Sequence, residues 1–135
     1  MSSEGLGKLD VWRRSKDFAV RVYREVLPCL PQEEKWGLAS QVRRSSQSIP
    51  ANIAEGYGRY YYQENIHFCY IARGSLDETI SHLILAAELG YLPDPLREAL
   101  VSDADELIRM LNGYIAYLKR TRQGEKEPGS QPSLS

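Results

Sequence analysis

The segment Ser48-Ile49-Pro50-Ala51-Asn52-Ile53-Ala54-Glu55-Gly56-Tyr57-Gly58-Arg59 carries the strongest structural signal in the chain. It places a proline inside an otherwise helical pattern and ends that pattern with two glycines and a tyrosine-rich turn. A proline in a helix interior removes one backbone donor and crowds the preceding turn, at a cost of about 3 kcal/mol. We therefore expect packing to offset this cost and the helix to bend locally. The helix-kink motif consists of Ile49, Pro50, Asn52 and Gly56.

Hydrophobic spacing on both sides of this segment predicts four helices, at about residues 9–28, 32–57, 62–89 and 94–121. The last is the clearest, because its apolar residues recur at alternating spacings of four and three. Those residues are Leu100, Ala104, Leu107, Leu111, Tyr114 and Leu118. Short connections make consecutive helices lie antiparallel, so we predict an all-α, antiparallel up-down-up-down four-helix bundle over residues 9–121. Residues 1–8 are predicted to be a flexible N-terminus, and residues 122–135 a disordered tail rich in glycine, proline and serine.

The predicted second helix has an unusual outer side, because most of its residues there are small. Small side chains let another helix approach closely, so this stripe is a candidate subunit contact, with plain exposure to solvent as the alternative. Its members are Ser40, Arg44, Ser48, Ala51 and Glu55. The predicted third helix is apolar over more than one face, which also favours a homo-oligomer.

The 135 residues include 17 Lys and Arg against 18 Asp and Glu, which gives no overall preference for nucleic acids or membranes. The first residues lack the basic start and apolar run of a secretory signal, and no apolar run approaches the roughly 20 residues that cross a bilayer. We therefore expect a cytoplasmic protein without a membrane partner. Cys29 and Cys69 lack metal-ligand spacing and lie in apolar surroundings, so both are expected to be reduced, buried thiols.

Neither a metal site nor a catalytic constellation is predicted. The only histidines, His67 and His82, are fifteen residues apart on one predicted helix, which separates them by about 23 Å. They therefore cannot share a metal ion, and no nucleophile lies at motif spacing from a base. We expect a protein that is not an enzyme and has no cofactor, no metal and no small-molecule substrate.

Antiparallel threading brings the start of the first helix, the turn between the second and third, and the end of the fourth to one end of the bundle. This end, which we call the pole, is predicted to be basic and rich in tyrosine. Its candidate nucleic-acid-binding residues are Arg13, Arg14, Lys16, Arg59, Tyr60, Tyr61, Lys119, Arg120 and Arg122, and Lys8, Tyr57, Tyr62 and Tyr117 lie there too. The acids expected there are Asp10, Asp17, Glu55 and Glu64.

Cations beside aromatic rings suit phosphate neutralisation combined with base stacking. An alternative remains open, in which the tyrosines cap the core and the basic residues stabilise a helix terminus. The opposite end of the bundle is expected to be acidic. Its acids are Glu33, Glu34, Glu88, Asp94 and Glu98, against Lys35 and Arg97.

The chain resembles the bacterial four-helix-bundle proteins known as 23S rRNA-intervening sequence proteins, from about Leu9 to Leu92 and less specifically through the fourth helix. The resemblance rests on several short motifs taken together. They are Val11-Trp12, Tyr23, Pro31, Glu34, Gly37-Leu38, Gln41, Arg43-Arg44, Ser48-Ile49-Pro50, Asn52-Ile53-Ala54-Glu55-Gly56, Gly58-Arg59, Phe68, Ile71-Ala72, Gly74-Ser75-Leu76 and Gly90-Tyr91-Leu92.

The resemblance implies an up-down bundle of unassigned biochemical function. Members are similar to the accessory variability protein of diversity-generating retroelements, which assembles as a five-membered ring and binds nucleic acid. We therefore expect a non-enzymatic homo-oligomer, a pentamer by resemblance, that binds RNA or DNA through the pole. A protein–protein adaptor or scaffold without nucleic-acid binding is the alternative.

Overall fold

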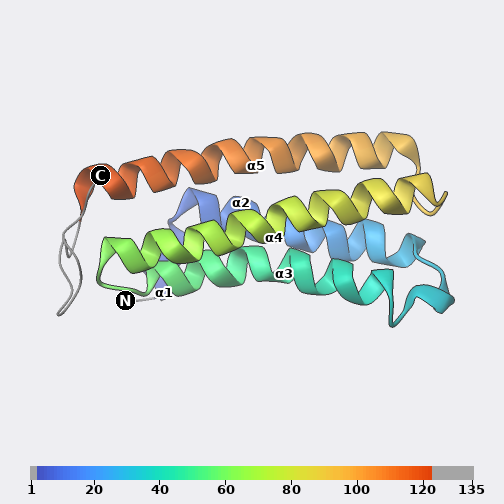
Figure 1. Cartoon of the computed structure of the whole chain (residues 1–135), viewed down its shortest axis with the longest axis horizontal. Coiled ribbons are helices and arrows are strands. Elements are labelled where there is room, and N and C mark those ends of the chain that lie inside the picture. Colours follow the sequence, from blue (N-terminus) through green and yellow to red (C-terminus); the bar gives the residue numbers. More distant parts are fainter. Residues whose placement is uncertain (1–2, 123–135) are drawn as a thin grey trace.

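The structure is a computed structural model that describes residues 3–122, and within this range every element is a helix (Figure 1). A π-helical turn and two 3-10 turns separate the second and third α-helices. The α-helices are α1 (Ser3–Gly7), α2 (Asp10–Arg21), α3 (Leu38–Tyr57), α4 (Tyr62–Glu88) and α5 (Asp94–Thr121), and the turns are η1 (Val22–Val26), η2 (Leu27–Cys29) and η3 (Gln32–Glu34). The predicted all-α fold class is confirmed.

The observed helix bounds agree best with the sequence pattern in the C-terminal half. α5 has the predicted range, and α4 ends one residue before the predicted position. The predicted first helix is α2 continued by η1 and η2, with a change of helix type at Val22. A short helix, α1, lies within the segment predicted to be a flexible N-terminus. The predicted disordered tail falls, after Arg122, outside the described residues.

The predicted start of the second long helix, at residue 32, is wrong. Residues 32–34 form the separate turn η3, and Gly37 has φ −105° and ψ −112°, which is not a helical conformation. The new helix therefore starts at Leu38, whose N–H donates to the Glu34 carboxylate at 3.1 Å. This carboxylate satisfies one of the backbone donors that every helix N-terminus leaves unpaired.

The long helices lie side by side, with α4 against α3 and α5, and α2 against the same two helices (Figure 1). Hydrogen bonds pair the hydroxyls of Ser45 with Thr79 and of Ser48 with Ser75, each at 2.8 Å. As the residue number in α3 increases from Ser45 to Ser48, the residue number of the bonded partner in α4 decreases from Thr79 to Ser75. The turn between these helices lies at the same end of the molecule as the C-terminal end of α5 (Figure 1).

The core runs the length of the long helices and contains the apolar seam predicted for α5. All members of that seam are buried except Tyr114, which is half-buried. Full burial of one such large apolar side chain stabilises a fold by about 1.5–3 kcal/mol. Side chains without solvent exposure include Val22, Val26, Val42, Ile49, Ile53, Leu76, Leu83, Leu100 and Leu111.

The helix-kink motif lies at the contact of α3 with its neighbours. α3 stays α-helical through Pro50, and Ile49 and Ile53, on either side of the proline, are fully buried. This burial is the packing that offsets the cost of the proline, whereas the local bend stays a prediction. The Asn52 side-chain amide donates at 2.8 Å to the Ser48 carbonyl and also to the Ser48 hydroxyl.

Gly56, the last member of the motif, lies where α3 approaches α4 closely. A Cβ atom at this position would lie 2.7 Å from the Asn65 side-chain oxygen and 2.9 Å from the Asn65 carbonyl oxygen. It would also lie 3.0 Å from the Cβ of Phe68. Only glycine therefore fits between these two helices without moving one of them.

The two cysteines differ in their surroundings. Cys69 is fully buried in the core, and burial raises the pKa of its thiol to about 12. Cys29 is exposed, so the prediction of a buried thiol is wrong there. The reason is that the last buried residue of this element is Val26, and Cys29 lies in η2 beyond it.

Candidate nucleic-acid interface

The pole is formed by the end of α3, the turn after it, the start of α4 and the end of α5 (Figure 1). Two contacts tie α5 to α4 there. The Asn65 amide donates to the Tyr114 hydroxyl at 3.2 Å, and the Arg122 guanidinium lies 5.8 Å from the centre of the Tyr62 ring. The structure thus brings together the predicted site residues Arg59, Tyr60, Tyr61, Lys119, Arg120 and Arg122.

The cations of the first long helix lie away from the pole, contrary to the prediction for Arg13, Arg14 and Lys16. Arg14 pairs with Glu106 of α5 at 3.4 Å. Glu106 precedes the end of α5 by fifteen residues, or about 23 Å of helix. α2 begins only four residues before Arg14, or about 6 Å of helix, so its N-terminus stops short of the end of α5.

Each of these three cations also has a carboxylate partner. Arg13 bonds to the Asp10 side chain and donates to the Gly7 carbonyl at 3.0 Å. Lys16 pairs with Asp17 at 2.8 Å. Since neighbouring acids offset their charges, they form a mixed-charge side surface instead of a basic patch.

Arg59 lies at the pole, but its guanidinium is already engaged in contacts with nearby side chains. Its guanidinium pairs with Glu55 at 2.7 Å and with Glu64 at 3.7 Å. The same group lies 5.0 Å from the centre of the Phe68 ring. Two carboxylates offset its charge, so Arg59 ties the turn to both helices and adds little net charge to the pole.

The tyrosines of the pole divide into two groups. Tyr62 is buried at 3 % exposure and Tyr57 is half-buried, so these two cap the core, as the alternative reading of the pole expects. Tyr60 is 66 % exposed and packs edge-on against Tyr61, with ring centres 5.0 Å apart. Tyr117, near the end of α5, is 50 % exposed and stacks nearly parallel to the Tyr114 ring, with ring centres 6.4 Å apart.

The net positive charge of the pole comes from the end of α5. Within residues 3–122, Lys119 and Arg120 form no ion pair with a carboxylate, and both are exposed. The Arg120 guanidinium lies 5.8 Å from the centre of the Tyr117 ring. Cations in the last turn also stabilise a helix, so this charge serves the fold as well.

Sequence reasoning missed two residues near the pole, Tyr70 and Arg73, which lie on α4 beside Lys119 of α5. The Arg73 guanidinium lies 4.9 Å from the centre of the Tyr70 ring, and the Lys119 ammonium lies 5.9 Å from the same centre. The spacing of Tyr70 and Arg73, three residues apart on a helix, was the available signal. Their closeness to Lys119 depends on the packing of α4 against α5.

The candidate oligomer-contact stripe is less uniform than predicted. Arg44, Ala51 and Glu55 are exposed, and Ser40 is half-buried. Ser48 is also half-buried and turns toward α4, where its hydroxyl bonds to that of Ser75. Most of the exposed large aliphatic residues of the described chain lie instead on α4 and just after its end, at Ile71, Ile84, Leu85 and Leu89, and Val20 of α2 is exposed as well.

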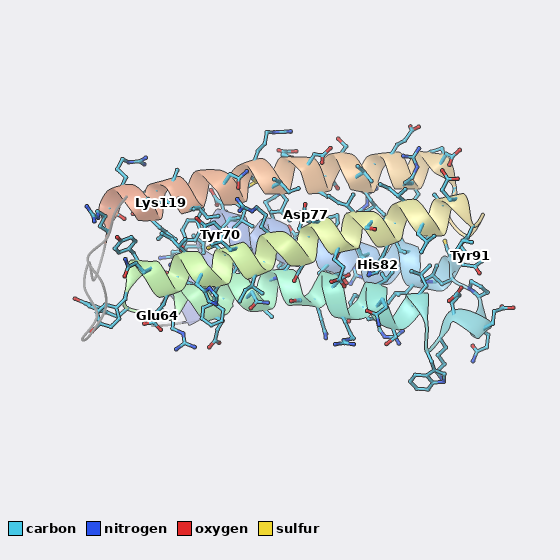
Figure 2. The ribbon with its side chains drawn as sticks, in the orientation of Figure 1. Glu64, Tyr70, Asp77, His82, Tyr91 and Lys119 are labelled. Carbon is cyan, nitrogen blue, oxygen red and sulfur yellow. The ribbon has the colours of Figure 1, made fainter. Side chains whose placement is uncertain are left out.

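Other classes of site were sought in the same residues. No group of three or more His, Cys, Asp or Glu side chains in residues 3–122 could hold a metal ion. His67 is exposed, and the His82 ring nitrogen lies 3.3 Å from the Glu78 carboxylate (Figure 2). None of the described helices combines the length and apolar character that a membrane span requires.

Comparisons with known proteins agree with the helical fold. A solved structure from Bacteroides thetaiotaomicron, titled a protein with unknown function from the S23 ribosomal protein family, is 29 % identical and superposes with a TM-score of 0.71. The match covers 78 % of this chain and 97 % of that chain. No functionally curated protein matches. The family model of the 23S rRNA-intervening sequence proteins matches residues 7–113, so the chain belongs to that family.

Proposed function

We propose that the chain is a non-enzymatic, cytoplasmic protein that forms an up-down-up-down four-helix bundle, assembles as a homopentamer, and binds single-stranded RNA or DNA through the pole. The observation that carries the proposal is the end of α5, where Lys119 and Arg120 lack carboxylate partners in the described chain and lie beside exposed aromatic rings. Cations can neutralise phosphates there, while the exposed ring of Tyr60 and the exposed part of the Tyr117 ring can contact bases. The name of the family, 23S rRNA-intervening sequence protein, refers to the same class of molecule.

Oligomerisation would raise the affinity for nucleic acid, which the small number of cations at the pole of a single subunit keeps low. The exposed aliphatic side chains of α4 and its C-terminal end are 39–50 % accessible in the single chain, which suits burial against a second copy. A ring with several poles on one side would bind one long strand at several points. Such multivalency can raise overall affinity by about 10²–10⁴.

The adaptor alternative rests on Trp36, which is 82 % exposed at the opposite end of the molecule. Lys35 lies over this ring, 5.2 Å from its centre, much as Arg120 lies over Tyr117. An exposed cation–aromatic pair is therefore present at each end of the molecule. This similarity supplies a matched control for the binding experiment.

The binding test measures the fluorescence anisotropy of a labelled twelve-nucleotide oligouridine at several salt concentrations. The double variant Arg120→Gln, Tyr117→Ala removes one phosphate contact and one stacking ring. We expect its salt slope to fall by about 0.7 and its affinity to fall by about tenfold. The control, Lys35→Gln with Trp36→Ala, should bind as the wild type does. Equal affinities for the two double variants would contradict the pole as the binding site.

The oligomer is tested separately by light scattering at micromolar protein concentration. A pentamer should give five times the 15.4 kDa mass of one chain. The double variant Ile84→Glu, Leu85→Glu should give a lower mass, because it places two charges on the exposed aliphatic surface of α4. A wild-type mass of one chain would contradict the homo-oligomer, and another closed assembly would contradict the pentamer alone.

A further inference from the structure

A groove between α4 and α5 adjoins the pole but lies outside the residues that the sequence singles out, apart from Lys119. It encloses about 350 Å³. Figure 2 shows Tyr70 and Lys119 facing this space from the two helices. The groove is lined by Tyr70, Arg73, Asn112, Ile115, Ala116 and Lys119.

The groove holds two cations close to one aromatic ring. The Arg73 guanidinium and the Lys119 ammonium lie 4.9 and 5.9 Å from the centre of the Tyr70 ring. Cation–π attraction holds each of them near the ring. No lining residue carries a carboxylate, so the walls of the groove hold no negative charge that would repel an anion.

Asn112 fixes the orientation of the arginine. Arg73 Nη1 donates to Asn112 Oδ1 at 2.7 Å, and the amide nitrogen of Asn112, a lining residue of the groove, is a further donor. The remaining N–H groups of Arg73 form the planar fork that matches two oxygens of a phosphate. The buried Ile115 supplies an apolar part of the groove wall.

We infer that this groove binds a backbone phosphate of a single-stranded nucleic acid whose neighbouring nucleotides occupy the pole. The inference rests on the proposed function and adds a phosphate position to it. Lys119 belongs to both surfaces, so it connects the pole to the groove. Arg73 and Asn112 are the residues that distinguish a phosphate subsite from a generally basic surface.

The experiment uses the full chain, the labelled oligouridine and three single variants. Arg73→Gln should weaken binding about fivefold and lower the salt slope by about 0.7, because one phosphate contact is lost. Arg73→Lys keeps the charge and should keep the slope. Arg24→Gln is the matched control, since Arg24 is an exposed arginine beside Tyr23 in the separate groove between α2 and α3, and it should leave both quantities unchanged.

Equal affinities of Arg73→Gln and Arg24→Gln for the oligouridine would overturn the phosphate site in the groove. Binding at the pole would still be tested separately by the double variant Arg120→Gln, Tyr117→Ala. Loss of binding by Arg73→Gln alone, with the pole variant unaffected, would support the phosphate position in the groove and contradict the placement of the neighbouring nucleotides on the pole. A second readout uses inorganic phosphate and the NMR signals of the Tyr70 ring. We expect phosphate to shift these signals in the wild type and not in Arg73→Gln, whether or not the oligouridine binds. The absence of a shift in the wild type would overturn the inference.

Discussion

Replacing Gly56 with alanine should destabilise the protein, although alanine is the better helix former. The new methyl carbon would lie 2.9 Å from the carbonyl oxygen of Asn65, a backbone atom of the facing helix. It would also lie 3.0 Å from the Cβ of Phe68. Neither atom belongs to the flexible end of a side chain, so α3 and α4 would have to move apart.

The sign of the change follows from two opposing terms. Alanine in place of glycine inside a helix stabilises by up to about 1 kcal/mol. Overpacking of a close contact costs about 1–3 kcal/mol. The chain offers two matched controls in Gly74 and Gly113, helical glycines where an added Cβ would meet nothing within 4 Å. Only the stabilising term applies at these two positions.

The assay is urea unfolding followed by circular dichroism for all three alanine variants. We expect Gly56→Ala to unfold at lower urea than the wild type, and Gly113→Ala to unfold at equal or higher urea. The free energies of unfolding of these two variants should differ by roughly 1–3 kcal/mol. A Gly56→Ala protein as stable as Gly113→Ala would refute the close approach of α3 to α4 at this position.

Three further predictions concern buried groups. An aromatic disulfide reagent should titrate one thiol, Cys29, in the native protein and two thiols in urea. The reason is that Cys69 is buried, which raises the pKa of its thiol to about 12. Two reactive thiols in the native protein would contradict this prediction. Burial raises the pKa of Tyr114 to about 12, so its contribution to stability is complete below its unfolded pKa of about 10 and is lost as pH rises toward 12. Tyr114→Phe should therefore lose less stability than the wild type between pH 9 and pH 11 in urea unfolding, and equal losses would count against this. Thr79→Val removes the partner 2.8 Å from the buried Ser45 hydroxyl, which keeps a bond to the Val42 carbonyl at 3.4 Å, and should cost about 0.5–1.5 kcal/mol. Ser45→Ala in the same chain should restore part of the loss, and a double variant no more stable than Thr79→Val would argue against that bond.

Periodic burial explains which helices could be predicted from the sequence. α5 has one apolar seam from Leu100 to Leu118, so the pattern defines both its face and its length. The start of α3 was missed because residues 32–36 contain no strong helix breaker. The break depends on the backbone conformation of Gly37, which apolar spacing does not report.

The pole was predictable where it depends on local spacing. Arg59 pairs with Glu55 four residues before it, a helical neighbour that the sequence shows directly. The position of Arg14 was not predictable, because its partner Glu106 is distant in the chain and depends on the stagger of α2 against α5. The groove at Arg73 was missed for the same reason, since Asn112 belongs to another helix.

Photo-crosslinking of a 4-thiouridine oligonucleotide tests the central claim most directly, with the attachment sites read by mass spectrometry of the digested protein. The account predicts attachment at Tyr60, Tyr117 and Tyr70, on the pole and the adjoining groove. Trp36 is the most exposed of the large hydrophobic side chains in the described chain and lies at the other end, so it reports nonspecific contact. Attachment mainly at Trp36, or on the α2–α3 side, would contradict the account.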